Sequence, residues 1–380
     1  MTENQEKAIQ YLEAFQEQSL VERFGKDYLS KYNDVLGLTK KTDFLNAYFN
    51  SQLNMTDEEK ADFTKSYDSS LKSCIIKTKY ELPESILILS SLFDKIDVAA
   101  TRLTYQLNKK PFIGTAFSKE FNAFAARVPG TEESLLVFES ELFTLCNLLA
   151  KIIASCLPDF KIDESGVSFN CKKIRIKNHI DTNPLIKERF KDFVINAVIN
   201  GLPNGTRQYF LSETVSKLQY ELLSSIELFI VGHEYGHIYA GHIDKALVKT
   251  RMINNEQLEF ISPDWQMEFE ADFYGLSLLV NTDSAHSFLP FSLLGPELLF
   301  TFLDIFERAN TLVALGTEIH SNGGNTHPPT IERRKKIREL LGESIPERLL
   351  DSYQVVSEFL ENVMEVLWAD FNHAHIRNGN

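Results

Sequence analysis

The sequence predicts a mainly α-helical protein with one small β element and a large helical N-terminal half. Apolar residues recur at helical spacing along most of the chain, and only the stretch near residues 159–178 shows the short alternation of strands. The 380 residues are 43% hydrophobic and 24% charged, which is typical of folded globular proteins. We therefore expect one large domain or two closely packed ones.

Helices are expected to make up the first part of the chain. Residues 1–72 carry an interrupted apolar stripe at helical spacing. Thr56 and Glu59 have the spacing of a capping box, which predicts a helix beginning at about residue 57. Two further helical patterns cover residues 83–107 and 132–157.

The predicted β element is a hairpin with a strand after it. Residues 160–162 and 167–169 flank a turn, and residues 173–177 alternate Lys or Arg with Ile. Such an edge strand could pair with an extended peptide, or it could be a solvated strand that its charges protect from aggregation. A helix is expected over residues 182–200, followed at residues 200–205 by the best linker candidate, a cluster of Gly, Pro and Asn.

Helices are again expected in the second half of the chain. A helical pattern begins at about residue 209, and others cover residues 294–315, 330–341 and 346–370. These helices would surround the one stretch whose residue types indicate chemistry.

That stretch is the motif H-E-x-x-H at residues 233–237. Apolar residues on both sides keep a helical pattern through it, and residues four apart lie on one face of a helix. His233 and His237 can therefore direct two imidazole nitrogens at one metal ion. Glu234 lies about 100° around the helix, where its carboxylate can hold a water without occupying a coordination position. Zinc hydrolysis requires this division of roles.

A zinc site of this kind needs a third protein ligand. The pattern with a third His requires Gly at position 240 and His at position 243, but this chain has Ala240 and Ile243. A second helix is expected instead, with Ser262 as its N-cap. On that helix Glu268 can reach the metal, and Asp272, one turn later, can accept the outer N–H of a ligand histidine.

These motifs resemble a known family. H-E-Y-G-H followed by E-F-E-A-D at residues 268–272 is similar to the gluzincins, zinc peptidases with a Glu ligand, and most similar to the family of the CAAX prenyl peptidases and the bacterial heat-shock peptidase HtpX. T-H-P-P-T-I-E-R at residues 326–333 resembles a stretch that follows the ligand Glu in that family, and His242 is also commonly seen there. The resemblance covers roughly residues 220–340.

The resemblance implies a zincin-like metallopeptidase core. Zn²⁺ would be held by His233, His237 and Glu268, with Asp272 and His242 supporting the ligands, and Glu234 would act as the general base.

The developing oxyanion needs a donor besides the metal. His327 is the first candidate, Arg333 the second and Tyr274 the third. Two other interpretations stay open: His327 could simply precede a helix that begins after two prolines, and Arg333 could orient a carboxylate or the loop.

The relatives named above are integral membrane proteins, but no membrane span is expected here. A span needs about 20 mostly apolar residues. The best candidate, residues 287–306, is interrupted by Pro290, Gly295, Pro296, Glu297 and Asp304. The prenylated substrate of those relatives therefore does not follow from the resemblance.

Charge and cysteine content narrow the expected partners and compartment. A net charge of −14 argues against nucleic acid and against anionic membrane surfaces. The N-terminus is polar and acidic and has no apolar segment of a signal peptide. The four cysteines show no C-x-x-C spacing, which favours reduced thiols and a cytoplasmic location. They are Cys74, Cys146, Cys156 and Cys171.

The sequence therefore predicts a zinc-dependent endopeptidase with a protein or peptide substrate. Residues 1–200 would form a helical regulatory or substrate-recognition region, residues 201–345 the metallopeptidase core, and residues 346–380 a C-terminal helix and tail. The alternative is a helical binding or sensing protein whose zinc site is structural or inactive. Structural zinc usually has four protein ligands, and His242 would be the fourth, although its spacing directs it away from His237.

Overall fold

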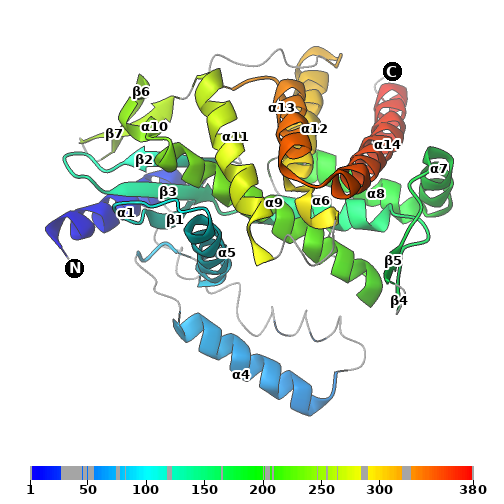
Figure 1. Cartoon of the computed structure of the whole chain (residues 1–380), viewed down its shortest axis with the longest axis horizontal. Coiled ribbons are helices and arrows are strands. Elements are labelled where there is room, and N and C mark those ends of the chain that lie inside the picture. Colours follow the sequence, from blue (N-terminus) through cyan, green and yellow to red (C-terminus); the bar gives the residue numbers. More distant parts are fainter. Residues whose placement is uncertain are drawn as a thin grey trace. The chain divides into compact units, whose positions relative to one another are not determined.

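The computed structural model describes residues 2–26, 45, 49, 55–73, 78–81, 83–117, 122–163, 166–199, 201, 206–207, 209–245, 247–253, 256–262, 264–283, 290–318 and 327–378. Their secondary structure is mainly α-helical, as predicted (Figure 1). The chain divides into two compact units. The first contains residues 1–94, 107–142 and 243–262, and the second contains residues 95–106, 143–242 and 263–380. Most of the predicted linker at residues 200–205 lies outside the described residues, and the predicted domain boundaries stay a prediction.

The first unit contains a mixed β-sheet. Its centre is β3 (Ser134–Glu139), which is parallel to β1 (Phe112–Ala116) and antiparallel to β2 (Ala123–Arg127). β2 also pairs with β7 (Glu256–Ser262), which forms an antiparallel ladder with β6 (Leu247–Ile253), so the strand order is β1-β3-β2-β7-β6. This sheet was not predicted, and the β content is larger than the one expected hairpin.

Helices of the first unit begin at the residues that their caps indicate. In α1 (Glu3–Phe24) the side chains of Thr2 and Gln5 form a capping box, and buried Leu12 and Phe15 pack in one cluster with residues of β1 and β3. The predicted start of α4 (Asp57–Ser73) is confirmed, because the backbone N–H groups at Thr56 and Glu59 bond reciprocally to the two side chains. α5 (Pro83–Arg102) follows, with residues 83–94 in the first unit and residues 95–102 in the second.

The helix predicted over residues 132–157 is wrong in its first part. Residues 134–139 form β3, and α6 (Leu142–Ser155) begins only after a turn. All six residues of β3 are buried. A strand buried on both faces has no polar alternation, so its apolar run cannot be distinguished from a buried helix by periodicity.

The second unit is built mainly from helices. They include α7 (Lys173–Thr182), α8 (Pro184–Asp192), a π-helix η1 (Phe193–Ile199), α9 (Glu213–Tyr239), α11 (Trp265–Val280), the short 3-10 helix η4 (Phe291–Leu293), α12 (Gly295–Leu315), α13 (Thr330–Ser344) and α14 (Glu347–Asn378). A four-residue helix, α10 (His242–Lys245), follows α9; His242 belongs to the second unit and residues 243–245 to the first. The helices predicted at 294–315, 330–341 and 346–370 are confirmed as α12, α13 and α14.

The predicted hairpin is confirmed, but its continuation is not a strand. β4 (Lys161–Asp163) and β5 (Gly166–Ser168) pair antiparallel. Residues 173–177 belong to α7 instead, where Ile176 and Ile180 are buried one turn apart and Ile174 is 61% exposed. The alternation of Lys or Arg with Ile therefore does not mark a strand, because Ile176 belongs to the buried face of a helix and Ile174 does not. The helix predicted over residues 182–200 is interrupted at Asn183, the C-cap of α7 and the N-cap of α8.

α9 and α11 lie against each other (Figure 1), and glycines allow their backbones to come into contact. A Cβ added at Gly236 would lie 2.9 Å from Ala271 Cα, and one at Gly232 would lie 3.1 Å from Gly275 Cα. A Cβ added at Gly275 would meet the backbone nitrogen of His233 at 3.0 Å. The backbones of the two helices are therefore in contact at these glycines, and this contact sets the spacing between the helices that carry the site.

A buried carboxylate joins the last three helices. Glu297 in α12 is 1% exposed and accepts hydrogen bonds from Arg338 Nε of α13 at 2.7 Å and Tyr353 Oη of α14 at 3.0 Å. Arg334 Nε lies 2.9 Å from its other oxygen. These contacts fix α13, and therefore Arg333, relative to α12.

Two further observations concern the cysteines and membranes. Cys146, Cys156 and Cys171 are free thiols, and Cys74 lies outside the described residues. No helix within the described ranges is long and apolar enough to cross a membrane.

Candidate metal centre

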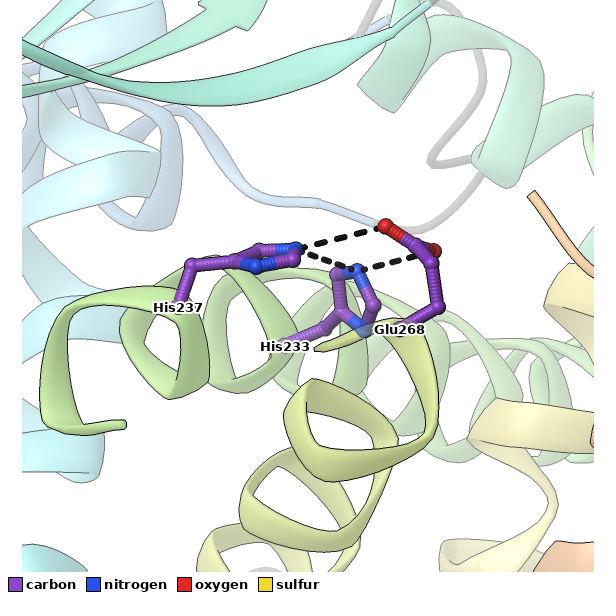
Figure 2. Close-up of side chains that lie close together, drawn as sticks. All are labelled: His233, His237 and Glu268. Carbon is purple, nitrogen blue, oxygen red and sulfur yellow. Dashed lines mark hydrogen bonds and ion pairs between the residues drawn. The ribbon is translucent and has the colours of Figure 1, made fainter. Parts of the chain in front are cut away.

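The two histidines of the motif lie on one face of α9 and point toward the same space. His233 Nε2 and His237 Nε2 are 3.3 Å apart, and the residues are 8% and 4% exposed (Figure 2). Residues 221–237 of α9 are almost all buried. The apolar run before the motif therefore anchors the helix in the core and holds both imidazoles in place.

Glu268 reaches the two histidines from α11. Its Oε1 lies 3.5 Å from His237 Nε2, and its Oε2 lies 3.8 Å from His233 Nε2 (Figure 2). The predicted N-cap was wrong: Asp264 caps α11 by accepting a hydrogen bond from the Met267 N–H at 2.9 Å, and Ser262 ends β7. The shorter helix keeps Glu268 in its first turn, where the positive end of the helix dipole favours a carboxylate.

The three side chains fit a metal ion. Their ligand atoms all lie within 4.8 Å of one another. Tetrahedral zinc with bonds of about 2.0–2.1 Å separates neighbouring ligand atoms by about 3.3–3.4 Å, close to the distances given above. Glu268 Oε2 is buried and has no hydrogen-bond partner among the described residues. The guanidinium of Arg333, with a terminal nitrogen 3.2 Å away, offsets part of the cost of burying this charge, and a cation between the three residues would give the oxygen a direct bond.

His233 is supported from the protein interior. Its Nδ1 lies 3.0 Å from Asp272 Oδ1, and Asp272 is itself bonded by Arg333 through Nε at 2.8 Å and a terminal nitrogen at 2.6 Å. Burial opposes ionisation of Asp272, but the Arg333 charge and these bonds still lower the pKa of that carboxyl. Burial also disfavours the charged imidazole of His233, yet the bond to Asp272 and the nearby Glu268 raise its pKa.

Arg333 is buried between the carboxylates of α11. It is 4% exposed, and its other terminal nitrogen lies 3.2 Å from Glu268 Oε2. Although burial opposes its charge, Asp272 and Glu268 raise the pKa of the guanidinium above its usual range. Arg333 therefore stays a permanent cation behind the ligands.

His237 is supported by a different group. Its Nδ1 lies 2.9 Å from Nδ1 of His242, which is 2% exposed. The expectation that the spacing directs His242 away from His237 is therefore wrong, because the chain turns at Gly241, with φ +69°, and does not continue as a helix. His242 thus contacts the ring nitrogen of His237 that does not face Glu268, and it is not among the described residues that converge as ligands. Burial lowers the pKa of His237 well below its usual value, and the charges of His233 and His242 act in the same direction.

Glu234 lies beside the ligands without joining them. It is 6% exposed, and burial raises the pKa of its carboxyl to about 7. Glu268 raises this pKa further, whereas His233 and Arg333 lower it. A carboxyl with such a pKa can both accept and return a proton near neutral pH.

The remaining candidates differ in position. The His327 side chain is 53% exposed, and its Nε2 lies 3.8 Å from Glu268 Oε1, so this residue borders the ligand group. Tyr274 packs its ring against Tyr105 and Tyr239, with centroids 5.2 and 6.0 Å away.

One residue at the site was missed in the sequence. Glu270 Oε2 lies 3.0 Å from His242 Nε2. The sequence position of Glu270, two residues after Glu268, does not indicate this contact. The contact depends on where the turn after α9 places His242.

Comparison with known proteins assigns no family. No protein-family model, no curated protein and no solved structure matches the chain. What stands is a buried His-His-Glu group that could hold a metal ion whose identity the structure does not specify.

Proposed function

We propose that this chain is a zinc-dependent endopeptidase. One observation carries the proposal: the described residues provide three converging metal ligands and no fourth, and a buried carboxyl, Glu234, stands next to them. Catalytic zinc sites have three protein ligands and one position for water or substrate, whereas structural sites usually have four protein ligands. The contact of His242 with the outer nitrogen of His237 supports the catalytic reading over a structural site.

The sequence motifs support the same class. H-E-x-x-H followed by a Glu ligand on the next long helix resembles the gluzincins, and T-H-P-P-T-I-E-R adds similarity to the prenyl peptidase and HtpX family. The geometry of α9 and α11 agrees with the ligand set of that resemblance.

In the proposed mechanism, His233, His237 and Glu268 would hold a Zn²⁺ ion. When bound, this ion would act as a Lewis acid and lower the pKa of the attacking water toward about 7. Glu234 takes the proton of the attacking water and returns it to the leaving amine. His327 borders the ligands and is exposed, so its ring can donate to the developing oxyanion.

Arg333 has a positioning role in this proposal. Its guanidinium is buried and bonded to Asp272, and it lies against Glu268, so it holds both carboxylates in register with the histidines. We place it behind the ligands rather than among the groups that touch substrate.

The test is zinc content and turnover of the purified protein. Wild type, Glu234→Gln and Glu268→Ala are compared by elemental analysis and by cleavage of an unfolded protein substrate. We expect one zinc per chain in wild type and in Glu234→Gln, most zinc lost in Glu268→Ala, and cleavage only in wild type.

Matched controls are Glu343→Gln and Glu343→Ala, which change an exposed carboxylate on α13. Both should keep zinc and cleavage. A wild-type protein without zinc, or zinc content indifferent to Glu268→Ala, would remove the metal site and with it the proposal. Cleavage retained in Glu234→Gln would remove the general base.

A further inference from the structure

A chain of hydrogen-bonding side chains runs from His237 to the protein surface. His237 Nδ1 contacts His242 Nδ1 at 2.9 Å, and His242 Nε2 contacts Glu270 Oε2 at 3.0 Å. Gln266 donates from Nε2 to the other Glu270 oxygen at 3.0 Å. His242 is 2% exposed, whereas the Glu270 side chain is 47% exposed.

The turn at the end of α9 brings His242 back to His237. Ala240 ends the helix, its N–H bonding to Gly236, and Gly241 follows with φ +69°. This left-handed conformation favours glycine. The chain turns at this residue, so the side chain of His242 lies against the last turn of α9, where it contacts His237.

The protons of this chain can have only one arrangement when His237 binds a metal. The Nε2 lone pair must face the ion, so His237 carries its proton on Nδ1 and donates it to His242. His242 must then accept at Nδ1 and carry its own proton on Nε2, from which it donates to Glu270. Each donor then meets an acceptor. No other pair of tautomers satisfies all three contacts, which are those of His237 with the metal, of His237 with His242 and of His242 with Glu270.

We propose that His242 and Glu270 are positioning residues that fix the tautomer and ring orientation of His237, so that metal retention depends on a carboxylate at the surface. The two ligand histidines are thus supported differently. Asp272 and Arg333 hold His233 from the buried side, whereas His237 is held through a second imidazole by a side chain that solvent and other molecules reach. The inference rests on the metal site of the proposed function, but not on peptide hydrolysis.

The experiment measures the zinc dissociation constant by competition with a chromophoric chelator, and the visible spectrum of the cobalt(II)-loaded protein. His242→Phe removes the support, and we expect zinc affinity to fall roughly 10- to 100-fold, the usual effect of losing such a partner. Glu270→Leu should weaken zinc in the same direction, and both variants should shift the cobalt(II) bands. His242→Asn and Glu270→Gln, which keep an acceptor, should recover part of the affinity.

A double variant separates a connected chain from two independent effects. If His242 and Glu270 act through one chain, His242→Phe with Glu270→Leu should bind zinc no more weakly than His242→Phe alone. Glu343→Leu is the surface control and should leave the affinity unchanged. Thermal unfolding of each metal-free variant tests the fold, and we expect unfolding temperatures close to wild type.

The outcomes separate this inference from the proposed function. Unchanged zinc affinity in His242→Phe, additive losses in the double variant, or losses that match lower metal-free stability would overturn the inference alone. Wild-type protein that binds no zinc overturns both proposals. Zinc binding that depends on His242 and Glu270 without cleavage of any protein substrate upholds the inference and overturns the peptidase.

Discussion

Two buried carboxyl groups on α9 both have a raised pKa, but only one of them lies beside the candidate metal ligands. Glu227 and Glu234 lie seven residues apart, two turns along the helix, and both are less than 10% exposed. Burial raises the pKa of Glu234 to about 7 and that of Glu227 to about 8. Glu234 stands beside the ligand group, whereas Glu227 is influenced by Lys95 of α5 and by no metal ligand. Glu227 should therefore affect stability and not metal chemistry.

We expect Glu227→Gln to stabilise the protein increasingly as pH rises from about 5 to 8. The native carboxyl keeps its proton up to about pH 8, whereas in the unfolded chain it ionises near the usual Glu pKa of 4.5. The native state thus binds more protons across this window, so the wild-type free energy of unfolding falls as pH rises through it. The gain of the variant should be near zero at pH 4 and on the order of 4–5 kcal/mol at pH 8.5.

Denaturant unfolding of the two proteins at several pH values measures this difference. A gain that did not grow between pH 5 and pH 8 would show that Glu227 is not held protonated. Zinc content should be equal in both proteins.

At the residue level the three candidate metal ligands could be predicted from the sequence, whereas the residues that contact them could be predicted only in part. His233, His237 and Glu268 follow from helical spacing and from the chemistry that zinc demands. Asp272 follows from the same spacing on α11. Glu270 could not be predicted, because its role depends on the positive φ of Gly241, which spacing along a helix does not reveal.

Among the elements, the α9–α11 pair decides whether the ligands can converge. The two helices meet through Gly232, Gly236 and Gly275, so their separation is set by backbone contact and not by side chains. Any added group at this contact must push Glu268 away from the histidines.

Gly236→Ala should therefore weaken both stability and zinc binding. The new Cβ would meet Ala271 Cα and Tyr274 Cβ at 2.9 Å, and neither can yield without moving α11. Overpacking of this kind costs about 1–3 kcal/mol. Chemical denaturation and chelator competition measure the two losses.

Gly342→Ala is the matched control, because its Cβ would be 3.8 Å from the nearest atom, Leu350 Cδ2, in ordinary contact. That change should leave zinc affinity unaltered and stabilise α13 by roughly 0.5–1 kcal/mol. Equal stability and equal zinc affinity of the two variants would mean that the α9–α11 contact can accommodate an added methyl group.

The accuracy of element prediction followed the range of the interactions involved. Local signals specify some helix ends, such as the capping box that begins α4 and the left-handed Gly316 that ends α12. The sheet is not specified locally, because β2 pairs with β7 across more than a hundred residues, at Ala126 with Phe260. The strand at residues 134–139 is buried on both faces, which removes the only periodic signal it could have given.

For the whole molecule, metal binding and folding should be coupled. The three ligands come from α9 and α11, and a cation held by them binds the native chain and not the unfolded one. Free zinc at about 100 times its dissociation constant should then raise the free energy of unfolding by about 2.7 kcal/mol.

Thermal unfolding with zinc and with excess chelator measures this coupling. We expect the unfolding temperature to rise with zinc concentration in wild type and not in His237→Ala. An identical rise in His237→Ala would place the stabilising zinc elsewhere on the chain.

The glycine contact between α9 and α11 also bears on how such a protein tolerates mutation. In a library of single substitutions, Gly232, Gly236 and Gly275 should be nearly as intolerant as the ligands, although none of the three has a side chain to offer a metal. Intolerance at these positions would report helix separation and not chemistry. A mutational map of this chain would therefore mark these three glycines together with the groups that could hold a metal ion.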